Sequence, residues 1–145
     1  MHDDRILRIA DANANRTREA LRVAEDVLRF WLENGALARK LKRERHAVSG
    51  LCDDLVGRGR VGLAARNVAA DPGKHSKPRS ETRRRDVGEI LVSNFRRAEE
   101  GLRVLEEIAK LVDAGASHRF KKSRFRVYQL EKSCTAALER EIAER

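Results

Sequence analysis

Two asparagine–arginine pairs recur at the same internal spacing in distant parts of the chain. Asn13 and Arg16 open the stretch NANRTREALRVAEDV, and Asn94 and Arg97 open the similar stretch NFRRAEEGLRVLEEI. An Asn amide offers both a donor and an acceptor, which suits the edge of a heterocycle. An Arg guanidinium can bind two phosphate oxygens at once. These residue types therefore indicate recognition of a phosphorylated heterocyclic compound.

The helical phase of both pairs predicts that they point into the protein. At ~100° per residue, Asn13 and Arg16 fall within the apolar arc of their helix, and Asn94 and Arg97 fall within the corresponding arc of theirs. An inward guanidinium without a partner costs several kcal/mol, so we expect an anion beside each arginine. The apolar residues that define the two arcs are Ala20, Ala24, Val27, Leu28 and Trp31, and Ile90, Leu105, Ile108 and Val112.

Two identities for that anion remain open. Glu19 and Glu100 lie one turn away and could form buried ion pairs with the arginines. Alternatively, a phosphorylated ligand enters a pocket at one end of the protein, closed by a basic loop. Arg45 and Arg124 also fall on inward sides of their helices, where they either join such a pocket or extend their charged ends to water.

Other catalytic chemistry is sparse. The acids that could serve as a base or hold magnesium are Asp11, Asp71, Glu81, Glu19 and Glu100, and no metal-ligand set can be assigned. The stretch DPGKHS at 71–76 lacks the upstream glycine and strand of a P-loop. Cys52 and Cys134 fall among apolar helical positions, so we expect two buried thiols.

The repeat also determines the expected fold. Apolar periodicity predicts helices at 12–33, 36–56, 84–112 and 117–143, with Gly35 as a helix stop. The long Gly-, Pro- and Arg-containing segment 57–83 separates two similar helical hairpins, 12–56 and 84–143. Because neither hairpin can bury its apolar face alone, we expect an all-α four-helix bundle, with residues 1–145 forming a single domain with an approximate internal twofold.

Composition favours an anionic partner and excludes a membrane span. The net charge is +9, charged residues make up 38% of the chain and aromatic residues only 4%. No apolar run approaches the ~18 residues of a spanning helix, and the acidic N-terminal stretch lacks a signal-peptide pattern. We therefore expect a soluble, cytoplasmic protein.

Several motifs in order resemble the small hydroxymethylpyrimidine-phosphate kinase family, which occurs alone or fused to thiamine-phosphate synthase. They cover most of the chain: RIADANANRTREALRVAEDVLRF at 8–30, LAARNVAADPG at 63–73, SETRR at 80–84, NFRRAEEGLRVLEEIAK at 94–110 and RFRVYQLEK at 124–132. The segment between the two helical hairpins, 57–83, departs from the family pattern at Asn67, Pro72 and Lys74.

The resemblance implies a phosphotransferase of thiamine biosynthesis. ATP, with Mg²⁺, would phosphorylate 4-amino-5-hydroxymethyl-2-methylpyrimidine phosphate to the diphosphate. The expected catalytic acids are Asp11, Glu19 and Glu100. The expected substrate-binding residues are Asn13, Arg16, Asn94 and Arg97, and the expected nucleotide-binding residues are Arg66, Asp71, Arg79, Glu81 and Arg84.

Two other functions remain open. The chain could be a non-catalytic helical partner domain of thiamine-phosphate synthase, because its loop departs from the family pattern. It could also be a basic nucleic-acid-binding module, although it has few aromatic residues and no groove-reading motif. A homo-oligomer is compatible with each of these functions.

Overall fold

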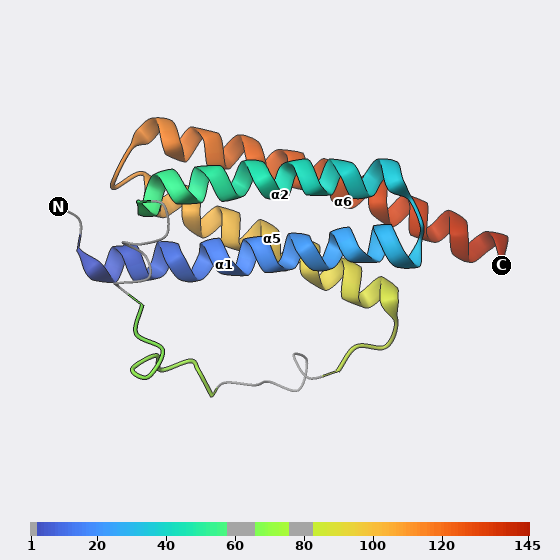
Figure 1. The fold of residues 1–145 in the computed structure, drawn as a ribbon, viewed down its shortest axis with the longest axis horizontal. Helices are drawn as coiled ribbons and strands as arrows, with labels where there is room; N and C mark the ends of the chain where they lie inside the picture. Colours follow the sequence, from blue (N-terminus) through green and yellow to red (C-terminus); the bar gives the residue numbers. More distant parts are fainter. Residues whose placement is uncertain (1–2, 58–65, 76–82) are drawn as a thin grey trace.

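A computed structural model describes residues 3–57, 66–75 and 83–145. The described chain forms an all-α bundle, as the sequence predicts, and it contains no strand (Figure 1). None of the described helices is long and apolar enough to cross a membrane. The helices are α1 (Asp4–Asp26), continued by the π-helix η1 (Val27–Trp31), α2 (Gly35–Val56), α5 (Val87–Ala109) and α6 (Ala114–Glu144).

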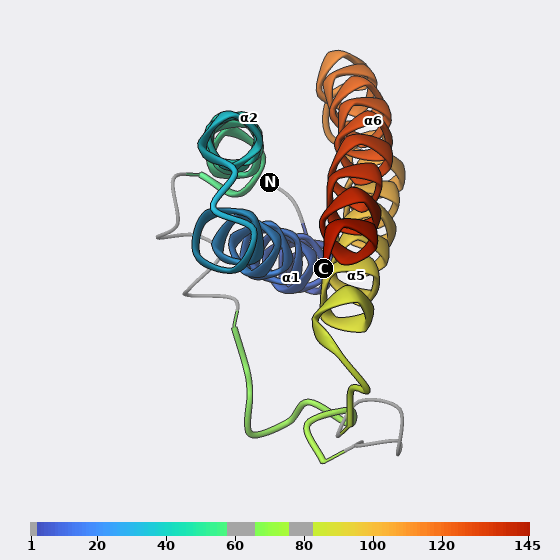
Figure 2. The same cartoon turned by 90° about the vertical axis from the view of Figure 1, so that its right-hand side faces the viewer.

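Equivalent helices of the two repeats pack against each other. The hairpins α1–α2 and α5–α6 lie side by side, so that α1 contacts α5 and α2 contacts α6 (Figure 2). Leu21 and its repeat equivalent Leu102 are both fully buried, as are Val48 and its equivalent Val127. Each hairpin therefore covers the apolar face of the other, which is the reason for the repeat.

Side-chain caps set helix boundaries that differ from the predicted ones. The first helix begins at Asp4 rather than at residue 12, because the Asp3 side chain accepts a hydrogen bond from the Arg5 backbone N–H. The third begins at Val87 rather than at residue 84, because Asp86 caps the N–H of Glu89. That helix ends at Ala109, not at residue 112, and the fourth occupies 114–144 instead of 117–143.

The end of the first helix also differs from the prediction. The π-helix at Val27–Trp31 changes the helical phase, so that Leu28 stays buried while Trp31 is 48% exposed instead of facing the core. Gly35 is not the helix stop. It is the first residue of α2, Asn34 caps the N–H of Leu37, and Glu33 adopts the left-handed φ of 51° at the turn.

The closest approach of the two hairpins lies at Thr17 and Gly101. A Cβ added to Gly101 would stand 2.3 Å from the Thr17 hydroxyl oxygen, so only glycine allows α1 and α5 to come this close. Thr17 is fully buried, and its hydroxyl donates to the backbone oxygen of Asn13 at 2.8 Å. This contact fixes the face of α1 that turns inward, and hence the faces left for a ligand.

Candidate functional site

A cleft of about 600 Å³ lies between the N-terminal half of α1 and residues 66–71 of the segment that connects the hairpins. Figure 1 shows the green trace of residues 66–75 beginning beside that half of α1. The cleft brings together five residues that the sequence singles out as site residues: Asp11, Asn13, Arg16, Arg66 and Asp71. Its other lining residues are Arg5, Arg8, Ile9, Ala12, Asn15, Asn67 and Val68.

A two-point ion pair anchors the connection to α1. The Arg66 guanidinium donates to both carboxylate oxygens of Asp11, at 2.9 Å and 3.0 Å. Asp11 is 6% exposed, and its hydrogen bonds raise the pKa of Arg66 above its usual value. Asp11 thus neutralises Arg66 and holds the wall of the cleft in place.

The residues after Arg66 form two consecutive turns closed by their own side chains. Asn67 accepts a hydrogen bond from the Ala70 N–H at 3.0 Å, and Asp71 accepts one from the Gly73 N–H at 2.8 Å. The Lys74 ammonium donates to the Ala69 backbone oxygen at 3.2 Å. Asn67 and Lys74 therefore hold the conformation of this segment, and Asn67 itself lines the cleft.

The prediction that Arg16 and Arg97 point inward is wrong. Both side chains are exposed, because the contact with the neighbouring helix is centred on Thr17 in α1 and on Gly101 in α5. Neither arginine makes a hydrogen bond or ion pair with another residue in the described part of the chain. Arg16 instead presents an uncompensated guanidinium to the cleft, where Arg8 also contacts the Asn67 backbone oxygen at 3.5 Å.

The two repeated asparagines behave alike. Asn13 is 6% exposed, and its amide nitrogen donates to the Ile9 backbone oxygen at 2.9 Å. Asn94 is half-buried and donates to the Ile90 backbone oxygen at 2.8 Å. The repeat thus conserves the same local contact within each helix, but only Asn13 lies on the cleft, while Asn94 and Arg97 are away from it.

Glu19 and Glu100 do not form the predicted ion pairs with Arg16 and Arg97. Both acids are exposed, and neither lines the cleft. The buried ion pairs involve another acid of each repeat, Glu25 with Arg45 at 2.8 Å and Glu106 with Arg124 at 3.0 Å. The four residues occupy matching positions in the two repeats, which was the signal that could have identified them.

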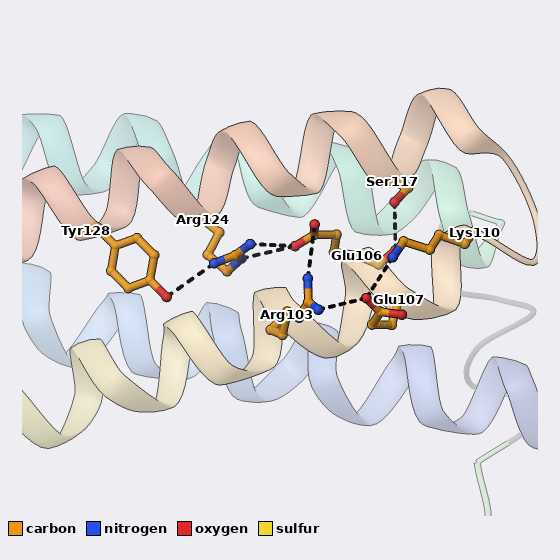
Figure 3. Close-up of polar contacts among 7 residues, drawn as sticks. All are labelled: Arg103, Glu106, Glu107, Lys110, Ser117, Arg124 and Tyr128. Atoms are coloured by element: carbon orange, nitrogen blue, oxygen red, sulfur yellow. Dashed lines mark hydrogen bonds and ion pairs between the residues drawn. The ribbon is translucent and has the colours of Figure 1, made fainter.

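The second of these pairs belongs to a larger polar network on α5 and α6 (Figure 3). Glu106 accepts from Arg124 and also faces Arg103 at 3.3 Å, while Arg103 pairs with Glu107 at 3.0 Å. Arg124 donates to the Tyr128 hydroxyl at 3.3 Å. Every cation of this network therefore already has an anionic or polar partner.

The remaining predicted site residues are placed as follows. Arg79 and Glu81 lie outside the described residues. Arg84 is exposed, and its guanidinium donates to the Arg83 backbone oxygen at 3.1 Å. Within the described residues, no group of three or more His, Cys, Asp or Glu side chains is arranged to hold a metal ion. Cys52 and Cys134 are buried, as predicted, and burial raises the pKa of each thiol to about 12.

Residues missed by sequence reasoning include Arg5, Arg8, Asn15 and Val68, which also line the cleft. Arg5, Arg8 and Asn15 stand on the same helix as Asp11, so helical spacing from that acid was the available signal for them. Val68 reaches the cleft only because Arg66 pairs with Asp11, a contact between residues 55 positions apart.

Comparison with known proteins places the chain in a family. Residues 8–133 match the model of the ThiD2 family, so the chain belongs to that family. It is 43% identical over 126 residues to a thiamine-phosphate synthase of Synechocystis sp., covering 87% of this chain and 35% of that protein. A thiamine-phosphate synthase of Nostoc sp. is 40% identical, with 87% and 34% covered, and one of Rhodopirellula baltica is 32% identical, with 85% and 32% covered. The chain thus spans about a third of the length of these relatives, and no solved structure matches it.

Proposed function

We propose that this ThiD2-family chain acts in thiamine biosynthesis as a helical partner domain of thiamine-phosphate synthase that binds a phosphate ester without transforming it. The observation that carries the proposal is the uncompensated guanidinium of Arg16 in a cleft whose wall is held by the Asp11–Arg66 pair. A fixed cleft that presents a cation without a described partner suits a phosphate group. The relatives named thiamine-phosphate synthase support the pathway and the partner.

The positions of the acids favour binding over catalysis. Both carboxylate oxygens of Asp11 accept hydrogen bonds from Arg66. Glu19 and Glu100 are exposed and lie outside the cleft. A general base must reach the hydroxyl whose proton it accepts, directly or through one water. Of the three acids expected to be catalytic, none combines a free carboxylate with a place on the cleft.

The second candidate is the kinase activity that the family resemblance implies. It is favoured by Asp71, an exposed carboxylate that lines the same cleft as Arg16. Mg²⁺ is commonly held by one or two carboxylates together with substrate phosphates, and phosphoryl transfer depends mainly on positioning and charge neutralisation. In this reaction the hydroxymethyl oxygen would attack the γ-phosphorus of ATP, ADP would leave, and the hydroxyl proton would pass to a base or to water.

One experiment separates these functions. The full chain is incubated with γ-labelled ATP, Mg²⁺ and 4-amino-5-hydroxymethyl-2-methylpyrimidine phosphate, and equilibrium dialysis measures pyrimidine phosphate binding in parallel. The partner-domain proposal expects binding without label transfer, whereas label transfer to the pyrimidine establishes the kinase. Absence of both binding and transfer overturns both candidates. Polynucleotide binding that falls steeply with salt would instead indicate the nucleic-acid-binding alternative.

A further inference from the structure

A second groove, of about 690 Å³, lies between α5 and α6, on helices that do not line the cleft described above. Two carboxyl side chains face each other in it, Glu99 from α5 and Glu131 from α6. The other lining residues are Arg96, Glu100, Arg103, Arg124 and Tyr128. The groove therefore has two acids side by side within a ring of polar groups.

Both acids have a buried oxygen without a partner. Glu99 is 5% exposed, and with both carboxyls ionised the Oε2 atoms of Glu99 and Glu131 have no donor among the described residues. A hydrogen bond between the two acids requires a proton on one of them. The other oxygen of Glu131 faces the Arg96 guanidinium at 3.5 Å. Two adjacent carboxylates cannot both stay charged in such surroundings without a bound proton or cation between them.

In the first repeat, a cation occupies the position equivalent to Glu99. The repeat equivalent of Glu99 is Arg18, whose guanidinium forms an ion pair with Asp53 of α2 at 3.7 Å. In the second repeat, a carboxyl replaces that guanidinium and meets another carboxyl. The repeat equivalent of Asp53 is Lys132, so the two charges are exchanged between the repeats, but Lys132 is exposed and does not line the groove.

The neighbouring arginines do not supply this charge. Arg124 binds Glu106, and Arg103 binds Glu106 and Glu107 in the network of Figure 3. Arg96 reaches only the outer oxygen of Glu131. Among the described residues no cation reaches the buried oxygens of Glu99 and Glu131, which need either a proton shared between the two carboxyls or a cation from outside the chain that displaces it.

We propose that the α5–α6 groove binds a small organic compound through a planar nitrogen cation, an amidinium or guanidinium, held between Glu99 and Glu131. A planar cation of this kind donates two parallel hydrogen bonds to a carboxylate, as Arg66 does to Asp11. The ring of Tyr128, 41% exposed on the wall of the groove, offers a flat surface for the cation or for an attached ring. The site is independent of the cleft at Arg16, so either can fail without the other.

A proton competes with this ligand. Burial, followed by the hydrogen bond and the charge of Glu131, raises the pKa of Glu99 to about 8. The groups facing the pair are Arg96, Glu100 and Arg103 from α5, and Arg124 and Tyr128 from α6. Below that pKa the cation must expel the proton, so its affinity is expected to rise by up to about tenfold per pH unit between pH 6 and 8.

The test uses benzamidinium as the probe and benzamide, its neutral analogue, as the chemical control. Binding to the full chain is followed by calorimetry and by NMR shifts of groove residues. Glu99→Gln preserves the shape of the protonated carboxyl, and Glu139→Gln changes an exposed carboxyl of α6 that lies outside this groove. We expect one benzamidinium per chain, binding at least about tenfold weaker to Glu99→Gln and unchanged to Glu139→Gln.

Three outcomes would overturn the proposal. Absence of saturable benzamidinium binding would mean that a shared proton alone satisfies the pair. Equal binding of benzamide would show that the cation is not recognised. Equal binding to Glu99→Gln, with thermal melts showing that the variant is folded, would place the probe elsewhere on the protein.

Discussion

Replacing Gly101 with Ala tests the contact that sets the packing of the two repeats. The added Cβ would lie 2.3 Å from the Thr17 hydroxyl oxygen and 3.3 Å from the Asn13 backbone oxygen. Reaching ordinary contact requires a shift of about 1 Å in a fully buried pair, and such overpacking costs ~1–3 kcal/mol. Ala is more favourable than Gly by ~1 kcal/mol in a helix interior, which offsets part of the steric cost. With a steric cost of ~3 kcal/mol in this fully buried contact, we expect Gly101→Ala to lower the unfolding free energy by about 2 kcal/mol.

The chain supplies a matched control and a rescue. Gly50 lies within α2 with nothing near its added Cβ, so Gly50→Ala should gain ~0.5–1 kcal/mol from the same substitution. The repeat equivalents of Thr17 and Gly101 are Ala98 and Ala20, an alanine pair. Thr17→Ala combined with Gly101→Ala should therefore recover most of the loss, giving non-additivity of at least ~1 kcal/mol.

Urea denaturation followed by circular dichroism measures the unchanged chain, Gly50→Ala, Gly101→Ala, Thr17→Ala and the double variant. The reasoning is refuted if Gly101→Ala is as stable as Gly50→Ala, because α1 and α5 would then not meet as closely as described. It is also refuted if the two substitutions at Thr17 and Gly101 simply add.

Three further predictions concern buried charge and thiols. Glu25→Gln and Glu106→Gln should each lower the unfolding free energy by about 2 kcal/mol, less than the ~3–5 kcal/mol of a fully buried pair, because the partner arginines partly reach water. The exposed control Arg22→Gln should change it by less than ~0.5 kcal/mol, and equal effects of all three substitutions in urea melts would contradict the burial of the ion pairs. Because the pKa of Glu99 is raised to about 8, the folded chain binds more protons than the unfolded chain between about pH 4.5 and 8, so the stability contributed by this group falls as pH rises through that window. Glu99→Gln should remove this part of the pH dependence, and an unchanged slope of unfolding free energy against pH would contradict the prediction. Cys52 and Cys134, with thiol pKa values raised to about 12, should react with a disulfide reagent only after unfolding, and rapid labelling of the native chain would show that they are accessible.

The fold was predictable because the repeat consists of long helices, whose apolar residues recur with a clear period. The apolar stripe of the second helix, including Leu41, Val48 and Leu55, is buried as its spacing predicts. The boundaries were less accurate, since they depend on single side chains such as Asp3 and Asp86 that cap backbone N–H groups. The π-turn before Trp31 has no counterpart in an ideal 3.6-residue period, so its change of phase was not predictable from periodicity.

The candidate site was predictable in part of its residues but not in its geometry. Asp11, Asn13, Arg66 and Asp71 were singled out from the sequence and lie on one cleft. Periodicity placed Arg16 inside the apolar arc, but a helix that packs through Thr17 leaves the flank of that arc open to water. The pairing of Asp11 with Arg66 links two segments distant in sequence, so helical spacing could not predict it.

Calorimetric titration of the pyrimidine phosphate into the full chain, into Arg16→Ala and into Arg22→Ala tests most directly whether the cleft binds a phosphate ester. Arg16 has no described partner in the cleft, and Arg22 is an exposed arginine of the same helix that pairs with Asp26 at 3.4 Å. We expect binding to the full chain and to Arg22→Ala with similar affinity, and at least about tenfold weaker binding to Arg16→Ala, the loss of one charge-assisted contact to phosphate. Equal affinity of Arg16→Ala and Arg22→Ala, or absence of binding to the full chain, would contradict a phosphate-ester site in this cleft.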